Sequence, residues 1–438
     1  MGNLSIAPTP SRLVSLVLAL ALGTSQAQAA PGAPEAGAPP TWTPPFDAEL
    51  QVDAAYVHQR PDNKAAIVGL IKRNSRFRVT GCAPSCEAPR AWAVLGDQGA
   101  IRLSLLKVAA PDTPALEQLP EFLYGKVLGS GADVRAEPDA QARRVKRELA
   151  GRVLAFVRDE QLLAQGWLKR PGGGFVSAQQ LRLDQPSSFR GEEHPSGPIA
   201  FLWKSAKLEP DAVVPPPPIE TAGLPASALD TGGAPPAPEP LPKFARFPLL
   251  EMTRRTVRVP GGTLPRGAVR LAFPRPRPAS VPPGAKWVHV DLSEQVLTAY
   301  EGDTWVYATL VSTGKPGDSK TITHSGLFRV WSKTLHELMA EENEYFVEEV
   351  PYTQYFHAGE ALHGAFWHSS FGVPVTHGCV NLSLADARWL FAWAPPALPS
   401  GWHSYLVQPG MEPLWVQVER AKPGVLSLTS APVVSSVP

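Results

Sequence analysis

The chain has 438 residues, which at roughly 150 residues per domain suggests two to four domains. Its 41 Lys and Arg residues against 40 Asp and Glu residues leave a net charge of +1. This balance excludes a typical nucleic-acid-binding protein, in which a basic excess is expected. Proline is unusually frequent at 49 residues, about 11% against a usual ~5%, and predicts long linkers between folded parts.

The N-terminus has the pattern of a secretory signal peptide. Residues 13–22 form an apolar run behind Arg12, too short to cross a bilayer, which needs ~20 residues. The sequence Ala-Gln-Ala at 27–29 then predicts cleavage after Ala29. We expect residues 1–29 to direct export to the periplasm or cell wall, with no membrane span in the mature chain; an uncleaved apolar N-terminus is the alternative. Residues 30–46, rich in Ala, Pro and Gly, read as a flexible tether.

Three cysteines occur in the chain. Cys82 and Cys86 are separated by Ala-Pro-Ser, and in an exported protein such a pair favours a disulfide. The alternative is half of a zinc site, for which His58 is the nearest further ligand. Cys379 is left without a partner, and an unpaired thiol in an oxidising compartment is expected to be buried or used.

Two consecutive segments predict small β-domains. Residues 47–110 alternate apolar and polar side chains over short runs. Residues 122–184 repeat the layout, with an offset of 77 between Pro61 and Pro138 (138 − 61), each segment carrying a later Trp, Trp92 or Trp167. This pattern resembles tandem bacterial SH3-like domains, small β-barrels presumed to bind peptidoglycan. Two β-domains that merely space the rest of the chain are the alternative.

A proline-rich region follows. Residues 208–242 lack core-forming side chains and predict an extended interdomain linker. Residues 243–285 read as a basic, proline-rich connecting segment, forming either edge strands or a wrapped segment. Its positive charges are expected to face solvent.

From residue 286 the pattern changes to that of a β-rich domain. Residues 286–312 predict a β-meander of three strands separated by turns. A helix is predicted at 383–391, with Ser383 as its N-cap and Pro395 after its end. Residues 410–438 are left as a C-terminal tail.

The residues that suggest chemistry lie just before that predicted helix. His363-Gly364 precedes Thr376-His377-Gly378-Cys379 by a short interval. A catalytic cysteine needs a base or a lowered pKa, and a helix N-terminus close behind it would favour the thiolate. Glycine beside the nucleophile allows a substrate to approach the backbone, whose N–H groups then stabilise an oxyanion.

Two other interpretations of this histidine-rich block remain open. A zinc site would use four histidines and one cysteine that fall within 23 positions. Their spacing matches no common zinc pattern, and Glu360 is the one obvious carboxylate. These residues are His357, His363, His368, His377 and Cys379. The other interpretation is a set of core histidines around a buried thiol. We expect neither a metal nor a cofactor.

The block resembles the signature of the L,D-transpeptidase catalytic domain, also called the YkuD domain. In that family a His-Gly precedes [Ser/Thr]-His-Gly-Cys-x-[Asn/Arg], and residues 363–364, 376–379 and Asn381 fit each position. Ser-Thr-Gly at 312–314, with Thr323, Gly326 and Phe328, resembles a second family motif. His324-Ser325 departs from that motif, where Pro-x is usual.

The resemblance implies a role for each matching residue. Cys379 would be the nucleophile and His363 the general base, oriented by the carbonyl of Gly364. The N–H groups of Gly378 and Cys379 would face the oxyanion. His377 would shape the loop, Asn381 would brace it, and Tyr355, with Tyr352 as competitor, would offer a hydroxyl to the substrate. The acyl-binding side would be lined by Trp367, His368 and Thr376.

The resemblance also implies a fold and a reaction. Residues 286–409 would form a mostly β catalytic domain with one or two short helices. The thiolate would attack a peptidoglycan stem tetrapeptide, release D-Ala, and pass the acyl group to an amine to make a 3→3 cross-link. Carbapenem sensitivity is the family expectation, and we expect a monomer. The alternatives are an L,D-carboxypeptidase, in which water is the acceptor, and a wall-binding scaffold without activity.

Overall fold

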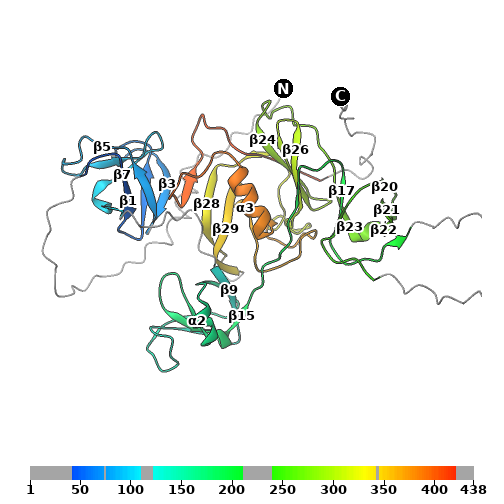
Figure 1. Ribbon diagram of the computed structural model, residues 1–438, viewed down its shortest axis with the longest axis horizontal. Helices are drawn as coiled ribbons and strands as arrows, with labels where there is room; N and C mark the ends of the chain where they lie inside the picture. The colour runs from blue at the N-terminus through cyan, green and yellow to red at the C-terminus, as the bar shows by residue number, and fades with distance from the viewer. Residues whose placement is uncertain (1–41, 74, 110–121, 211–238, 342–344, 421–438) are drawn as a thin grey trace, which may run out of the picture. The chain divides into compact units, whose positions relative to one another are not determined.

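The computed structural model describes residues 42–73, 75–109, 122–210, 239–341 and 345–420. Strands dominate this part of the chain, as predicted, and short helices join them (Figure 1). No helix among the described residues is long and apolar enough to cross a membrane. The predicted signal peptide lies outside the described residues, as do most of the tether, the centre of the proline-rich region and the end of the C-terminal tail.

The first β-unit, residues 42–109, has a core of small and branched side chains such as Val57, Ile71 and Ile101. Strand β1 pairs with β4 and β8, and β2 pairs with β3 and β7. The strands of this unit are β1 (Phe46–Leu50), β2 (Ala54–His58), β3 (Ile67–Lys72), β4 (Arg76–Val79), β5 (Gly81–Ala83), β6 (Trp92–Val94), β7 (Ala100–Arg102) and β8 (Leu106–Val108), with the 3-10 helix η2 (Leu103–Leu105) before β8.

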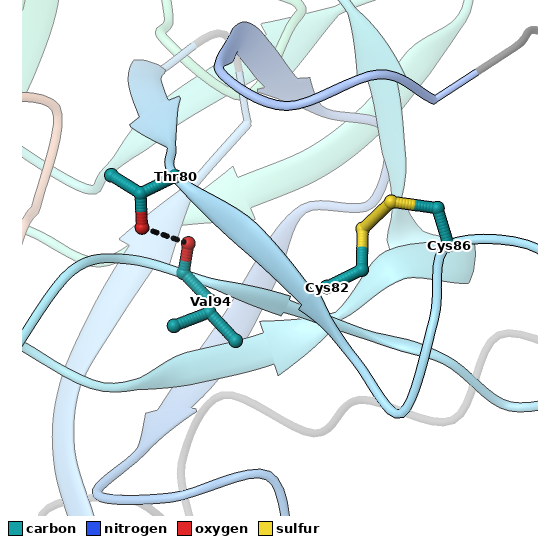
Figure 2. The surroundings of a disulfide bond; sticks show 4 residues. All are labelled: Thr80, Cys82, Cys86 and Val94. Carbon is teal, nitrogen blue, oxygen red and sulfur yellow. Dashed lines mark hydrogen bonds between the residues drawn. A yellow bond between two sulfur atoms is a disulfide. The ribbon is translucent and has the colours of Figure 1, made fainter.

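A disulfide closes the turn that follows β5. Cys82 lies in that strand and Cys86 in the turn, and the bond between them has an S–S distance of 1.98 Å (Figure 2). Beside it the Thr80 hydroxyl donates to the carbonyl of Val94 at 3.1 Å. The two cysteines are therefore bonded to each other and are not half of a zinc site.

The second β-unit, residues 122–184, ends as the first one does, in a strand, a 3-10 helix and a strand. This shared ending agrees with the repeat seen in the sequence. The described strands form no closed barrel, and the SH3-like assignment stays a prediction. The elements are β9 (Phe122–Val127), β10 (Ala132–Arg135), β11 (Arg144–Glu148), β12 (Val153–Val157), α2 (Glu160–Ala164), β13 (Trp167–Lys169), β14 (Phe175–Ser177), η3 (Ala178–Gln180) and β15 (Leu181–Leu183).

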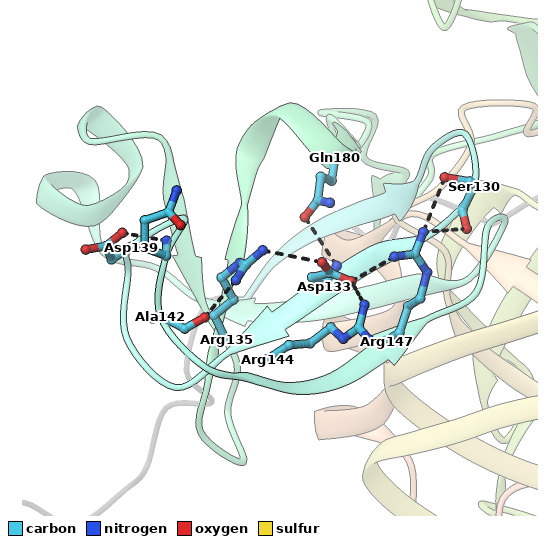
Figure 3. Close-up of polar contacts among 9 residues, drawn as sticks. Ser130, Asp133, Arg135, Asp139, Ala142, Arg144, Arg147 and Gln180 are labelled. Carbon is cyan, nitrogen blue, oxygen red and sulfur yellow. Dashed lines mark hydrogen bonds and ion pairs between the residues drawn. The ribbon is translucent and has the colours of Figure 1, made fainter.

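Asp133 organises the polar face of this second unit. Its carboxylate lies 2.9 Å from Arg147 and 3.5 Å from both Arg135 and Arg144 (Figure 3). The three guanidinium groups thus converge on one carboxylate at the β10–β11 hairpin. Since these arginines are partly solvated, each pair contributes little, of order 0–1 kcal/mol.

Residues 199–273 form a third β-unit that the sequence did not predict. Strand β17 pairs with both β19 and β23, so the two sides of the proline-rich region belong to one sheet. Leu208 and Leu241, at the two ends of the predicted linker 208–242, both pack on this core, and 243–285 is largely a folded part. Residues 211–238 lie outside the described residues, so the linker itself stays a prediction. The elements are β17 (Ile199–Leu202), β18 (Glu209–Pro210), β19 (Arg246–Pro248), β20 (Glu251–Met252), β21 (Thr256–Val259), β22 (Gly262–Pro265), η4 (Arg266–Ala268) and β23 (Val269–Ala272).

The C-terminal domain contains a six-stranded sheet in the order β16-β26-β25-β24-β33-β27. The predicted meander is confirmed, since β24, β25 and β26 pair antiparallel in sequence order. The sheet also includes β33, which pairs parallel with β24 and contains fully buried Val416 and Val418. The first part of the predicted C-terminal tail is therefore a core strand. The strands are β16 (Glu192–Glu193), β24 (Lys286–Asp291), β25 (Val296–Glu301), β26 (Thr304–Leu310), β27 (Gly326–Arg329) and β33 (Trp415–Glu419).

The remaining strands and one helix complete the domain. Helix α3 (Leu384–Trp393) packs against β29 and β30 (Figure 1). The Ser383 hydroxyl accepts the N–H of Asp386 at 3.1 Å, which confirms the predicted N-cap. One apolar core joins both sheets and the helix, through side chains such as Val290, Leu362 and Leu390. The strands are β28 (Ser332–Glu341), β29 (Tyr345–His357), β30 (Glu360–Gly364), β31 (Val380–Leu382) and β32 (Ser404–Leu406).

Two buried carboxylates connect the C-terminal domain to the third β-unit and to the segment that precedes this unit. Glu294 accepts from the guanidinium of Arg266 and from the N–H of Leu271, the latter at 3.0 Å. Asp386, at the start of α3, accepts the N–H of Gly191 at 2.8 Å. Because an unpaired buried carboxylate is costly, these bonds fix residues 191 and 266–271 against the C-terminal domain.

Candidate active site

Two adjacent parallel strands bring the predicted nucleophile and base together. Cys379 immediately precedes β31, and His363 is the fourth residue of β30. The strands pair so that His363 lies opposite Asn381 and Leu362 opposite Val380. Residues 16 positions apart in sequence (379 − 363) therefore lie close together because β30 and β31 are neighbours.

His363 is held in one tautomer by its own strand. Its side chain is buried, and Nδ1 lies 3.2 Å from the carbonyl oxygen of Gly364. Nδ1 must carry the proton to donate to that carbonyl, so Nε2 keeps its lone pair. Burial lowers the pKa of His363 to about 4, and the nearby His368 adds to the decrease. The ring is therefore neutral at physiological pH, as a general base must be.

The Cys379 thiol is also neutral in this environment. Its sulfur lies 3.8 Å from the carbonyl oxygen of Gly359. Burial raises the pKa of Cys379 from 9.0 to about 11, although a backbone hydrogen bond from Ala361 lowers it, and the carboxylate of Glu360 raises it further. Burial therefore outweighs the thiolate stabilisation expected from the N-terminus of α3, which begins only after β31.

The loop before Cys379 is shaped by Gly378 and Thr376. Gly378 has φ +122°, a conformation that side chains disfavour. Its N–H donates to the Thr376 hydroxyl at 3.1 Å, and that hydroxyl donates to the carbonyl of Cys379 at 2.7 Å. The Gly378 N–H is thus hydrogen-bonded within the loop, and its role toward an oxyanion stays a prediction. Thr376 acts as a brace of the nucleophile turn.

Thr323 is a functional candidate whose role the sequence motif alone did not reveal. Its buried hydroxyl accepts the N–H of Gly314 at 2.8 Å and donates to the carbonyl of Gly378 at 2.7 Å. A Cβ on Gly314 would lie 2.1 Å from the carbonyl oxygen of Thr321, so only glycine fits there. The Ser-Thr-Gly motif and the threonine after it therefore support the nucleophile loop from behind.

Asn381 and His368 form a second support. The backbone N–H of Asn381 donates to the carbonyl of Ser312 at 2.8 Å, and the Ser312 N–H returns a bond at 3.0 Å. His368 Nε2 lies 2.9 Å from the Asn381 amide nitrogen, and His368 Nδ1 accepts the Ser370 N–H at 3.0 Å. Burial lowers the pKa of His368 to about 4. A neutral His368 therefore acts as a structural hydrogen-bonding group beside β31.

Aromatic side chains line the surroundings of His363 and Cys379. The Trp367 ring stacks near that of His363 with 5.8 Å between centroids. Burial raises the pKa of Tyr355, and the proximity of Cys379 adds to this increase. Tyr352 instead packs against Phe391 of α3. Of the two tyrosines, Tyr355 is therefore the one whose pKa the Cys379 thiol raises.

His377 is the exposed member of the predicted set. Its ring lies 5.4 Å from that of Tyr345, at the start of β29. The two strands β28 and β29 form a long antiparallel hairpin. The loop that carries Cys379 is thus contacted by this hairpin through an aromatic pair.

The five-residue zinc cluster considered as an alternative does not form among the described residues. Among the described residues, three potential metal-binding side chains lie close enough together to hold an ion. They are His324, His357 and Glu360. His363, His368, His377 and Cys379 are not part of it. The zinc-hydrolase interpretation based on those residues is therefore not supported by the arrangement.

Comparison with known proteins identifies the domain. Residues 285–413 match the family model described as the L,D-transpeptidase catalytic domain, YkuD. A search of curated proteins finds no match to this chain.

The similar solved structures are L,D-transpeptidases. One from Stackebrandtia nassauensis is 26% identical, covers 35% of this chain and 62% of its own, and has a TM-score of 0.25. One from Xylanimonas cellulosilytica is 26% identical, covers 33% and 64%, and has a TM-score of 0.24. L,D-transpeptidase 3 from Mycobacterium tuberculosis is 20% identical, covers 31% and 61%, and has a TM-score of 0.25.

The chain spans less than two thirds of the length of each of these structures. The family model, by contrast, covers β24 to β32 and every residue of the Cys379 loop, and ends just before β33. Residues 285–413 of this chain are therefore an L,D-transpeptidase catalytic domain of the YkuD family.

Proposed function

We propose that the chain is a cysteine L,D-transpeptidase that acts on peptidoglycan stem peptides through a thioester on Cys379. The observation that carries the proposal is the pairing of β30 with β31 within the matched domain. This pairing brings a neutral His363, with Nε2 unprotonated, to the strand beside the thiol. Such a pair provides a nucleophile and a general base.

Acylation follows from this pair. The Cys379 S–H proton passes to Nε2 of His363 as the sulfur attacks the carbonyl carbon of the third stem residue. The tetrahedral intermediate collapses, the bond to D-Ala breaks, and the leaving amine takes the proton from His363. Because Nδ1 stays bonded to the Gly364 carbonyl, that bond stabilises the transient imidazolium and holds the ring in place.

Deacylation reverses these proton transfers. An acceptor amine gives a proton to His363 and attacks the thioester carbonyl. The Cys379 sulfur leaves and regains its proton from His363. When the acceptor is the side-chain amine of a neighbouring stem, the product is a 3→3 cross-link; when it is water, the product is a tripeptide.

Intact-protein mass spectrometry tests the proposal. The mature chain is mixed with a disaccharide-tetrapeptide, and separately with a carbapenem, and the adduct is mapped. We expect a mass gain on Cys379 in both cases, no gain in Cys379→Ala, and a much slower gain in His363→Ala. Full turnover by Cys379→Ala would overturn the proposal. Products separated by chromatography then identify the acceptor, as cross-linked dimer for an amine or tripeptide for water.

We further propose that the chain works outside the cytoplasm, with its N-terminal β-units at the wall. The predicted signal peptide and the Cys82–Cys86 disulfide support export, since disulfides persist in oxidising compartments. The test compares sedimentation of the mature chain with purified sacculi against that of a chain lacking residues 42–184. Equal sedimentation of the two would mean that these units are spacers.

A further inference from the structure

Three metal-binding side chains converge beside the nucleophile loop, outside the Cys379–His363 pair. One nitrogen from His324, one from His357 and one carboxylate oxygen from Glu360 all lie within 4.8 Å of one another. His324 precedes β27, His357 ends β29, and Glu360 begins β30. The cluster is therefore a product of the tertiary fold and not of one local motif.

Two of the three side chains are held in place before any ion binds. Glu360 is buried. Its carboxylate accepts the backbone N–H of His324 at 3.2 Å and also contacts Nδ1 of the His324 ring. The His357 ring packs on Phe328 with 4.5 Å between centroids. The His324 side chain, although bonded to Glu360, remains 48% exposed.

The donor set matches a known preference of metals. Two imidazole nitrogens and one carboxylate oxygen suit zinc and similar divalent transition metals, which bind them at about 2.0–2.2 Å and leave a fourth position open to water. Ligand atoms at these bond lengths lie closer together than 4.8 Å, so the three side chains must shift when an ion binds, and the exposed His324 has the most room to do so.

We propose that His324, His357 and Glu360 form a site for a divalent transition-metal ion, with Zn²⁺ as the fitting occupant. His324 stands where the sequence departs from the family motif. The site is separate from the acyl-transfer pair, and its failure would leave the proposed function untouched.

The position of the site indicates what the ion does. Thr323, next to His324, donates to the carbonyl of Gly378. Glu360 Cγ lies 3.5 Å from where a Cβ on Gly378 would be. An ion bound to all three ligands therefore links the segment behind the nucleophile loop to the β29–β30 turn, and so stabilises the loop from two sides.

Zinc binding by the tag-free, chelator-treated full chain tests the proposal. The chain carries Cys379→Ala, so that the thiol cannot serve as a ligand, and Zn²⁺ binding is measured by calorimetry and by elemental analysis after dialysis. We expect one bound ion per chain. His357→Ala and Glu360→Gln should each weaken binding roughly tenfold or more, while His194→Ala, an exposed histidine outside the cluster, should not.

A second readout identifies the ligands directly. Co²⁺ in place of Zn²⁺ should give visible bands that disappear in His324→Ala, and with Cys379 intact the spectrum should show no thiolate-to-cobalt charge-transfer band. Circular dichroism confirms that each variant is folded. The proposal is overturned if the Cys379→Ala chain binds no stoichiometric zinc, or if binding is the same in His357→Ala, Glu360→Gln and His194→Ala.

Discussion

Changing the pH should reveal that the resting nucleophile is a neutral thiol and not a thiolate. Burial raises the pKa of Cys379 to about 11 and lowers that of His363 to about 4. Near neutral pH neither group is charged. The proton must therefore move from sulfur to Nε2 during the attack, and no ion pair is present beforehand.

The size of the effect on the thiolate fraction follows from the shift in the pKa of Cys379. A rise from 9.0 to about 11 is two pH units, so the thiolate fraction at neutral pH is about 100-fold below that of an ordinary cysteine. Because the thiolate is the species that iodoacetamide alkylates, the rate for Cys379 should be about 100-fold lower than for the same cysteine in urea. It should rise about tenfold per pH unit until the pKa is approached.

Alkylation of the chelator-treated chain, followed by intact mass, measures this directly. The other two cysteines are joined in the Cys82–Cys86 disulfide, so a single adduct reports on Cys379. Carbapenem acylation should behave differently: it should be nearly independent of pH near neutrality and decline on the acid side as His363 gains a proton. His363→Ala should slow acylation while leaving the alkylation profile in place.

One result would refute this reasoning. An alkylation rate that stays constant between about pH 6 and 9 would mean that the thiolate is already formed, as in a Cys⁻–His⁺ pair. The protein would then have a lowered thiol pKa, and the environment of Cys379 described above would be wrong.

Three further substitutions test the supports of the site and of the fold. Thr323→Val removes the bonds to Gly378 and Gly314 and should slow carbapenem acylation roughly tenfold, a loss of about 1.4 kcal/mol; Thr321→Val, which also removes a hydroxyl from this segment, serves as the control. Asp386→Ala leaves buried donors unpaired and should lower the free energy of unfolding by about 3 kcal/mol or more in urea titrations. Lys333→Met removes a buried ammonium that donates to three carbonyl oxygens, one in α3 and two just after it, and should lower Tm. An unchanged Tm would mean that the cost of burying the charge offsets the stabilisation from these hydrogen bonds.

Local signals in the sequence were sufficient for several elements. The alternation over 286–312 predicted β24, β25 and β26, and Ser383 with Pro395 predicted α3 to within two residues at its C-terminal end. These signals succeed because strand alternation and helix capping depend on neighbouring residues. The motif around Cys379 likewise identified the domain that the family model matches.

Other elements depended on partners far away in the sequence. The third β-unit was missed because β17 and β23 are separated by a long proline-rich stretch that reads as a linker. Strand β33 was assigned to a tail because its pairing with β24, over more than 120 residues, leaves no local trace.

The sequence by itself was enough to propose Cys379 as nucleophile and His363 as base, because the two residues belong to a spaced motif. Only the tertiary structure decided their protonation states, since those depend on burial and on neighbours brought in by β30 and β31. The tertiary structure also decided that the Gly378 N–H donates to the Thr376 hydroxyl, and that the His324 ring contacts the Glu360 carboxylate. Solvent exclusion and long-range contacts are properties of the packed chain, and no short stretch of sequence contains them.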